Sequence, residues 1–358
     1  MKILSVVGAR PQFVKLAPIA HAATRHGVQH IVAHTGQHYD ANMSQSFFDE
    51  LRIPAPDHNL GVGSSSHGAQ TGQMLIDLEP VMLAEQPDWV LVYGDTNSTL
   101  AAAVCATKLH LPLAHLEAGL RSFNRRMPEE HNRVLTDHSA DLCLAPTEVA
   151  MRHLATEGLA DRSVLVGDVM TDVLLDTARA VTAAPVASPI EAAGDYAVAT
   201  IHRPDNTDDP DRLAAILAAL AAMPYPVHLA AHPRLVSKSR AHGLTLDQGS
   251  VRTVAPLSYP QLVQAVSAAR CVVTDSGGLQ KEAFLLGTPT TTVRAETEWV
   301  ETLEGDWNQL VNTPEEILAS ATRPRPDSRR GAPYGDGRAA DAVLSHLINR
   351  TPERGNIP

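Results

Sequence analysis

Residues 1–15 read MKILSVVGARPQFVK, and this stretch decides the fold. An apolar run, Ile3–Val7, is followed at once by GARP (residues 8–11) and then by an Ala- and Leu-rich helical pattern that begins near Gln12. A buried strand that ends at a glycine turn and leads into a helix is typical of a parallel α/β sheet. With one Lys and so short an apolar run, the N-terminus is a first strand and not a signal peptide.

The same alternation of short Val/Ile/Leu runs and longer helical patterns continues along the chain, which predicts stacked βα units on mostly parallel sheets. Further strands are expected at residues 31–34, 89–93, 113–116, 142–145, 164–166, 196–201, 227–231, 251–254, 271–274 and 290–293. Residues 180–194 are rich in Ala, Pro and Ser and separate two such series. We therefore predict two domains, residues 1–175 and residues 190–337, and a last helix within residues 338–358.

The composition limits the classes of function. With 358 residues and 44% apolar residues, the chain can bury two cores. A net charge of -11, the lack of a basic run and only 4% aromatic residues argue against nucleic acid as a partner. No apolar stretch approaches the roughly 20 residues of a membrane span. The three cysteines are scattered, which predicts buried thiols in the reducing cytoplasm, and no metal-ligand spacing occurs, so no metal is expected.

Polar residues follow the ends of the predicted strands again and again, in both halves of the chain. The positions are GARP (8–11), GDTN (94–97), EAG (117–119), His202-Arg203, His232 and DSGG (275–278). In open parallel sheets, ligands bind beyond the carboxyl ends of the strands. Strand ends from both domains therefore predict one shared ligand cleft.

Ser276, Gly277 and Gly278 open a helix, and such a turn suits an anion. Two glycines let the backbone approach a phosphate, and the free N–H groups and the helix dipole favour negative charge. Arg10 and Lys15 bracket the first helix start and would complete a diphosphate clamp. The simpler alternatives are an ordinary helix cap by Ser276 and two solvated cations.

Three carboxylates, Asp95, Glu117 and Glu129, are expected to converge on the cleft. Mutual repulsion would raise the pKa of at least one, which can make a base for a C–H proton. Glu129 and Arg133 are four residues apart on a helix, so a surface ion pair is the alternative for them.

Eight motifs in this order and spacing resemble the non-hydrolysing UDP-N-acetylglucosamine 2-epimerases over essentially the whole chain. They are GARPQ (8–12) with Lys15, TGQH (35–38), GDTNST (94–99), HLEAGLR (115–121), PEEHNR (128–133), IHR (201–203), TDSGGLQ (274–280) and PYGDG (333–337). The resemblance implies a GT-B-like fold of two Rossmann-like domains, with a ligand cleft between them and the last helix packing back on the first domain.

The resemblance also implies the chemistry. The substrate would be a UDP-sugar, whose C2 is inverted by elimination of UDP to a 2-acetamidoglycal and re-addition, with no cofactor. Asp95, Glu117, Glu129, Arg133 and His202 would surround the reacting centre. The residues expected to bind UDP are Arg10, Lys15, His202, His232, Ser276, Gly277, Gly278, Glu282 on the ribose, and Arg294. A homodimer is the expected assembly.

Two segments depart from the usual family pattern. Trp299 stands where GlcNAc-epimerase members usually carry an Arg, so that Arg294 would substitute, and SFNRRMP (122–128) replaces the usual segment before the Glu-Glu pair. Both are similar to the branch that includes 2,3-diacetamido-glucuronate 2-epimerases. A carboxylate at Asp40 predicts weak or absent activation by a second nucleotide. A hydrolysing epimerase, a GT-B glycosyltransferase and a non-catalytic UDP-sugar-binding protein remain the alternatives.

Overall fold

The computed structural model describes residues 1–37, 53, 55–190 and 194–350. The chain forms two compact units, one from Met1–Val173 together with the chain from Ala332 onward, and the other from Leu174–Gly331. The boundary falls inside helix α7 (Val169–Ala183). The segment predicted as a loose connection therefore begins as a helix, and only the residues after Ala183 lack regular structure among those described.

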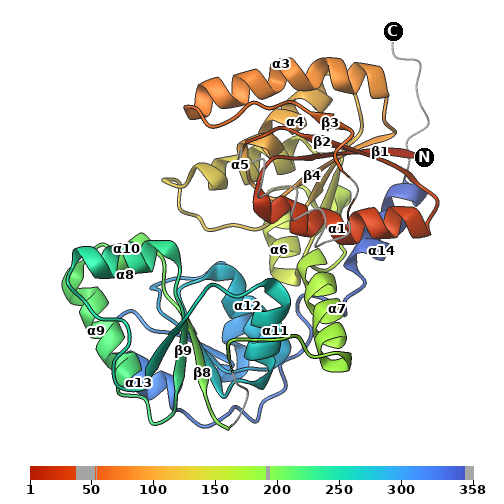
Figure 1. Ribbon diagram of the computed structural model, residues 1–358. Helices are drawn as coiled ribbons and strands as arrows, with labels where there is room; N and C mark the ends of the chain where they lie inside the picture. Colours follow the sequence, from red (N-terminus) through yellow and green to blue (C-terminus); the bar gives the residue numbers. More distant parts are fainter. Residues whose placement is uncertain (38–52, 54, 191–193, 351–358) are drawn as a thin grey trace. The chain divides into compact units, whose positions relative to one another are not determined.

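The first unit is built on a seven-stranded sheet with the order β3-β2-β1-β4-β5-β6-β7, in which every described strand pair is parallel (Figure 1). Its strands are β1 (Lys2–Val7), β2 (Gln29–His34), β3 (His58–Asn59), β4 (Trp89–Tyr93), β5 (Leu113–Leu116), β6 (Leu142–Ala145) and β7 (Ser163–Leu165). Its helices are α1 (Arg10–Arg25), α3 (His67–Glu85), α4 (Asn97–Lys108), α5 (Pro128–Ser139), α6 (Glu148–Thr156), the 3-10 helix Ala160–Arg162 and α14 (Ala339–Asn349).

Both faces of this sheet are covered by helices, so its central strand β4 is buried and apolar along its whole length. In β1, Ile3 and Val7 pack in a core with α1 and α14, whereas Leu4 and Val6 face a second core with α3 and α4. This alternation follows from the two-residue period of a strand.

Helix α14 lies along α1 in Figure 1, so the end of the described chain returns to the first unit. Val343, Leu344 and Leu347 are fully buried in the core with Phe13 and Leu16 of α1. The carboxylate of Asp172 accepts hydrogen bonds from the backbone N–H groups of Ala339 (3.0 Å) and Ala340 (2.8 Å), which satisfies the first turn of α14.

The second unit repeats the plan with a six-stranded parallel sheet of order β10-β9-β8-β11-β12-β13. Its strands are β8 (Ala197–Thr200), β9 (Val227–Ala230), β10 (Val251–Val254), β11 (Cys271–Thr274), β12 (Thr290–Thr292) and β13 (Asn308–Leu310). Its helices are α8 (Pro204–Thr207), α9 (Pro210–Ala221), α10 (Pro233–Ala241), α11 (Tyr259–Ala268), α12 (Gly277–Leu286), the 3-10 helix Val300–Asp306 and α13 (Glu315–Ala321).

The predicted fold class of two parallel α/β domains is confirmed, and each predicted strand is found with its ends shifted by at most two residues. The sequence did not indicate β3 and β13, which are two and three residues long and lie at sheet edges. Within the described residues, no helix combines the length and the apolar character needed to cross a membrane.

Candidate active site

The strand order of each sheet reverses at one point, between β1 and β4 in the first unit and between β8 and β11 in the second. Neighbouring connections leave such a point in opposite directions, which opens a crevice at the carboxyl ends of the strands. The turns after these four strands are the GARP, GDTN, IHR and DSGG motifs. Each unit therefore places its polar motifs where its topology provides a ligand site.

In the first unit, Gln12 ties the turn after β1 to the turn after β4. Its Oε1 accepts hydrogen bonds from the N–H groups of Gly8 (2.7 Å) and Ala9 (3.0 Å), and its Nε2 donates to the carbonyl of Tyr93 (2.8 Å). Gly8 has no room for a side chain, because a Cβ there would lie 2.1 Å from the hydroxyl of Ser98. The two turns are thus held at close range by backbone and buried amide contacts.

Four charged side chains meet beside these turns as two ion pairs. The ammonium of Lys15 on α1 pairs with Glu117 Oε2, and Arg133 Nη2 on α5 lies 2.6 Å from Asp95 Oδ2. The Glu117 and Lys15 groups lie over Gly94, where a Cβ would approach them to 3.1 and 3.4 Å. The structure therefore brings together Lys15, Asp95, Glu117 and Arg133 from four different segments.

Electrostatics at this cluster differ from the expected repulsion among three carboxylates. Burial would lower the pKa of Lys15, but Glu117 and Asp95 raise it above its ordinary value, so Lys15 stays charged. Glu117 and Asp95 each form an ion pair with a cation, and these pairs offset the repulsion expected between the carboxylates. Glu129, in the first turn of α5, is exposed and has no ion-pair partner among the described residues.

Glu117 also has an unusual backbone. Its φ is +68°, in the left-handed region, although its side chain is only 7% exposed. Such a conformation costs a non-glycine residue on the order of 1–3 kcal/mol and persists only where surrounding contacts hold it. Strained residues of this kind are frequent at functional sites, which is consistent with the role expected for Glu117.

Helix α5 buries polar residues, and this burial was not predicted from the PEEHNR motif. Glu130, Asn132 and Asp137 are at most 6% exposed. The Glu130 carboxylate accepts hydrogen bonds from the N–H groups of Ser122 and Phe123 at 2.9 Å each, and it also lies 2.9 Å from Arg133 Nη1. The considered Glu129–Arg133 surface pair is absent among the described residues, because Arg133 turns inward to Asp95 and Glu130.

A second buried network lies directly behind the cluster. Asp137 Oδ1 is 2.6 Å from His115 Nδ1, and Asp137 Oδ2 accepts from Arg121 Nη1 (2.7 Å) and from the N–H of Gly119 (3.0 Å). The other ring nitrogen of His115 donates to the carbonyl of Gly94 at 2.7 Å. His115 is thus bonded to the turn that carries Asp95 and stands two residues before Glu117.

In the second unit, Asp275 organises the crevice. It is fully buried and accepts from the N–H groups of His202 (3.0 Å) and Arg203 (2.9 Å), while His202 Nδ1 lies 3.1 Å from its Oδ1. Burial would raise the pKa of Asp275, but these contacts with His202 and Arg203 lower it below its ordinary value. The ring of His232 lies 5.2 Å from that of His202, and burial together with His202 lowers the pKa of His232.

The turn after β11 has the features of an anion site. Ser276 caps α12, and its hydroxyl accepts from the N–H of Leu279 at 3.3 Å. The helix cap expected as the simpler alternative is therefore present. It uses only one N–H group, that of Leu279. The N–H groups of Gly277 and Gly278 have no hydrogen-bond acceptor among the described residues. The turn therefore caps the helix and still has two N–H groups without an acceptor in the described part of the chain, and Glu282 follows on the same helix.

Arg294 places a positive charge next to this turn. Trp299 has a neutral side chain and supplies no such charge. Arg294 Nη1 is 3.0 Å from Glu298 Oε2 and 3.5 Å from the position of a Cβ on Gly277. Within the described chain, that nitrogen is buried and makes no well-aligned hydrogen bond, so its charge is met by the Glu298 carboxylate alone. Trp299 is buried, and its ring lies 3.9 Å from the ammonium of Lys281.

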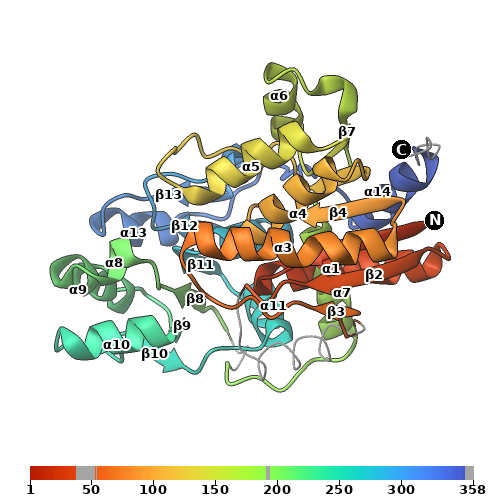
Figure 2. The same ribbon diagram turned by 90° about the horizontal axis from the view of Figure 1, so that it is seen from above.

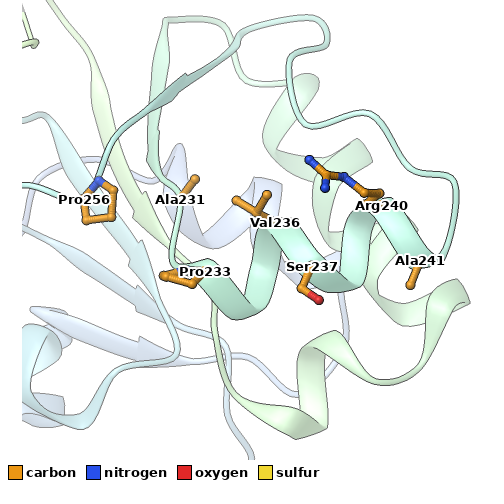
Figure 3. Close-up of a pocket in the computed structure, with 7 residues that line it drawn as sticks. All are labelled: Ala231, Pro233, Val236, Ser237, Arg240, Ala241 and Pro256. Carbon is orange, nitrogen blue, oxygen red and sulfur yellow. The ribbon is translucent and has the colours of Figure 1, made fainter. Parts of the chain in front are cut away.

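A pocket of about 500 Å³ lies beside His232, along α10 and at the carboxyl ends of β9 and β10 (Figure 3). Its walls are mostly apolar and include Ala231, Pro233, Val236 and Pro256. Ser237 and Arg240 add one hydroxyl and one cation to this lining, so the pocket combines apolar walls with a polar edge.

Some expectations fall outside the described residues. Arg10 begins α1, but its side chain lies outside the described part of the structure. Asp40, which carries the expectation about a second nucleotide, lies outside it as well. The catalytic set is divided between the units, since His202 belongs to the second and Asp95, Glu117, Glu129 and Arg133 to the first. The described residues contain no group of three or more His, Cys, Asp or Glu that could hold a metal ion.

Comparison with known proteins gives consistent matches. Residues 21–348 match the model of the UDP-N-acetylglucosamine 2-epimerase family. The chain is 44% identical to UDP-2,3-diacetamido-2,3-dideoxy-D-glucuronate 2-epimerase of Pseudomonas aeruginosa, over 97% of this chain and 99% of that protein. It is 43% identical to a UDP-N-acetylglucosamine 2-epimerase homolog of Methanococcus maripaludis, over 98% and 100%.

Solved structures agree. The Methanocaldococcus jannaschii UDP-GlcNAc 2-epimerase in complex with UDP-GlcNAc and UDP superposes with a TM-score of 0.81 at 36% identity, covering 98% of this chain and all of that one. The Neisseria meningitidis enzyme bound to UDP-GlcNAc gives a TM-score of 0.82 at 26% identity, with the same coverage.

Proposed function

Because the chain belongs to the UDP-N-acetylglucosamine 2-epimerase family, we propose that it inverts C2 of a UDP-linked N-acetylated sugar without hydrolysing the bond to UDP. The observation that carries the proposal is the pairing of Lys15 with Glu117 and of Arg133 with Asp95 at the switch point of the first sheet. The arrangement supplies carboxylates for proton transfer and cations for a departing anion in one place.

The chemistry requires both kinds of group. No carbonyl adjoins C2, so its proton is removed as the C1–O bond to UDP breaks, which leaves a 2-acetamidoglycal and UDP. Re-addition of UDP to C1 and protonation of C2 on the opposite face complete the inversion. Asp95, Glu117 and Glu129 serve as base and acid, and Lys15 and Arg133 counter the charge of the leaving diphosphate.

The UDP end is assigned to the second unit. The free N–H groups of Gly277 and Gly278 and the guanidinium of Arg294 suit the diphosphate, to which we also assign Arg10 and Lys15. Ser276, Glu282, His202 and His232 complete the nucleotide site. The apolar pocket next to His232 suits the uracil ring.

Oxygen isotope exchange tests this route. A UDP-sugar with ¹⁸O in the C1–O–P bridge should scramble the label into the non-bridging oxygens of the β-phosphate, because UDP is free to rotate after elimination. Retention of the label in the bridge during epimerisation would contradict elimination. Release of free sugar would instead indicate the hydrolysing reaction.

For the sugar we propose a 2,3-diacetamido uronate in preference to unmodified UDP-GlcNAc. The 44% identity over nearly the full length to the Pseudomonas aeruginosa enzyme supports it, as do the SFNRRMP segment and Trp299. A panel of UDP-HexNAc substrates that differ at C3 and C6 tests the choice, and a higher kcat/KM for UDP-GlcNAc would reverse it.

We also propose that the enzyme is a cytoplasmic homodimer. Cys105, Cys143 and Cys271 are free and buried, as suits a reducing compartment. On α3, Ile76 and Leu83 lie seven residues apart on one helix face and are 66% and 51% exposed, and such a stripe suits a second copy of the chain.

A further inference from the structure

A second pocket, of about 450 Å³, lies in the first unit between the loop at 122–127 and the N-terminal turns of α3, α4 and α5. The three helices lie side by side in Figure 2. His67 opens α3, Asn97 opens α4 and Pro128 opens α5, and all three residues line the pocket. The positive ends of three helix dipoles therefore meet at its wall.

The pocket is also charged. Arg125 and Arg126 line it, both are exposed, and neither guanidinium pairs with a carboxylate among the described residues. None of the residues that line the pocket is acidic. In a chain with a net charge of -11, a concave surface with two unpaired arginines and no carboxylate is suited to an anion.

The loop that carries the arginines is fixed to α5. His131 Nε2 donates to the carbonyl of Arg125 at 2.9 Å, and the Glu130 carboxylate accepts from the N–H groups of Ser122 and Phe123. Burial would raise the pKa of Glu130, but the donors of Ser122 and Phe123 lower it, so it stays ionised and keeps the loop anchored.

The pocket shares a wall with the reacting centre. Asn132, which lines the pocket, donates through Nδ2 to the carbonyl of Asp95 at 2.9 Å and to Asn97 Oδ1 at 3.3 Å. The pocket residue Pro128 precedes Glu129 directly, and Asn132 precedes Arg133. A substituent on a sugar held at Asp95 is therefore within a short reach of the arginines.

We propose that Arg125 and Arg126 bind the C6 carboxylate of the sugar, and so select a UDP-linked uronic acid over its neutral C6-hydroxymethyl analogue. The inference rests on the proposed function, whose reacting centre it adjoins. Guanidinium groups match a carboxylate in geometry as well as charge, since two parallel N–H donors face its two oxygens.

The test compares two substrates in the full-length enzyme. Arg125→Gln and Arg126→Gln, singly and together, should lower kcat/KM for UDP-2,3-diacetamido-2,3-dideoxyglucuronate by about 10- to 100-fold, the scale of lost charged hydrogen bonds. The same variants should change kcat/KM for UDP-GlcNAc less than about threefold. Arg152→Gln on α6 removes an equal charge from an exposed position outside the pocket and is the matched control.

Three outcomes overturn the inference. Equal losses with both substrates would assign the arginines to folding or to the nucleotide. A wild-type enzyme that epimerises UDP-GlcNAc and does not prefer the uronate would contradict the pocket's role and leave the epimerase function standing. Calorimetry showing a second UDP-sugar bound per chain, lost in the double variant, would make the pocket a separate nucleotide site. Absence of C2 exchange with either substrate would reject the proposed function itself.

Discussion

Asp95, Glu117 and Glu129 are three carboxylates in three different settings. Asp95 is held by Arg133, Glu117 is held by Lys15 in a left-handed backbone conformation, and Glu129 is exposed. The positions of Asp95 and Glu117 follow from the sequence, because polar residues after buried parallel strands meet at one sheet edge. Their pairing with Lys15 and Arg133 does not follow from the sequence, since it depends on how α1 and α5 pack.

Removing the charge of each carboxylate should stop the reaction. We expect Asp95→Asn, Glu117→Gln and Glu129→Gln each to lower kcat at least about 100-fold, the usual scale for a lost acid or base. UDP affinity, measured by calorimetry, should be largely kept, because none of the three carboxylates is among the residues proposed to bind UDP. Near-wild-type turnover in all three would remove the basis of the assigned reacting centre.

Asp137 is the residue whose loss should matter most for stability. It is fully buried and accepts from His115, Arg121 and the Gly119 N–H, so Asp137→Asn removes the buried carboxylate that these donors share and leaves Arg121 paired with Glu157 alone among the described carboxylates. We expect a loss of about 3–5 kcal/mol in the free energy of unfolding, measured with urea at pH 7. A loss below about 1 kcal/mol would show that these buried ion pairs contribute no more to stability than pairs on the surface do.

The pH dependence of this loss has a defined sign. Burial would raise the pKa of Asp137, but His115 and Arg121 lower it below its ordinary value. The stabilisation is therefore complete above the unfolded-state pKa of about 4 and is lost as the pH falls toward the folded-state value. The difference in the free energy of unfolding between wild type and Asp137→Asn should therefore become smaller as the pH is lowered below about 5.

At the scale of elements, long apolar strands were predictable and short polar ones were not. The runs at 89–93 and 271–274 are buried on both faces and stand out as continuous hydrophobic stretches. β3 is the dipeptide His58–Asn59 at a sheet edge, where no apolar run is needed. The buried polar face of α5 was missed because charged helix residues usually face solvent.

A side chain at the first position of α12 would require the Glu298 carboxylate to move. A Cβ on Gly277 would lie 2.6 Å from Glu298 Oε1, whereas a Cβ on Gly278 would meet only Ser276 Oγ at 3.9 Å. Gly277→Val should therefore displace the Arg294–Glu298 pair, block the backbone and weaken UDP binding at least about tenfold by calorimetry. Unchanged affinity in a folded variant would count against the anion site.

Helix α3 should carry the subunit interface. Ile76→Glu places a charge in its exposed apolar stripe, and we expect sedimentation to show a shift from dimer to monomer. Gln73→Glu, on the same helix but already polar, is the control and should leave the dimer intact. A dimer that survives Ile76→Glu unchanged would place the interface elsewhere.

At the scale of the whole molecule, two sheets of the same plan carry the two groups of residues to which the proposed reaction is assigned. The first unit holds the carboxylates and the cations paired with them, and the second holds the capped turn with free N–H groups. The motif order along the chain places GARP and GDTN before the boundary in α7 and IHR and DSGG after it.

Proton NMR in deuterated water tests the central claim most directly. The enzyme is incubated with UDP-GlcNAc and, in parallel, with the 2,3-diacetamido uronate, and the C2 position of the nucleotide sugar is followed. We predict deuterium at C2 of the intact UDP-sugar together with the appearance of its C2 epimer, because the proton removed exchanges with solvent before C2 is protonated again. A C2 position that stays fully protonated with both sugars, or release of free sugar in place of the epimer, would contradict the account.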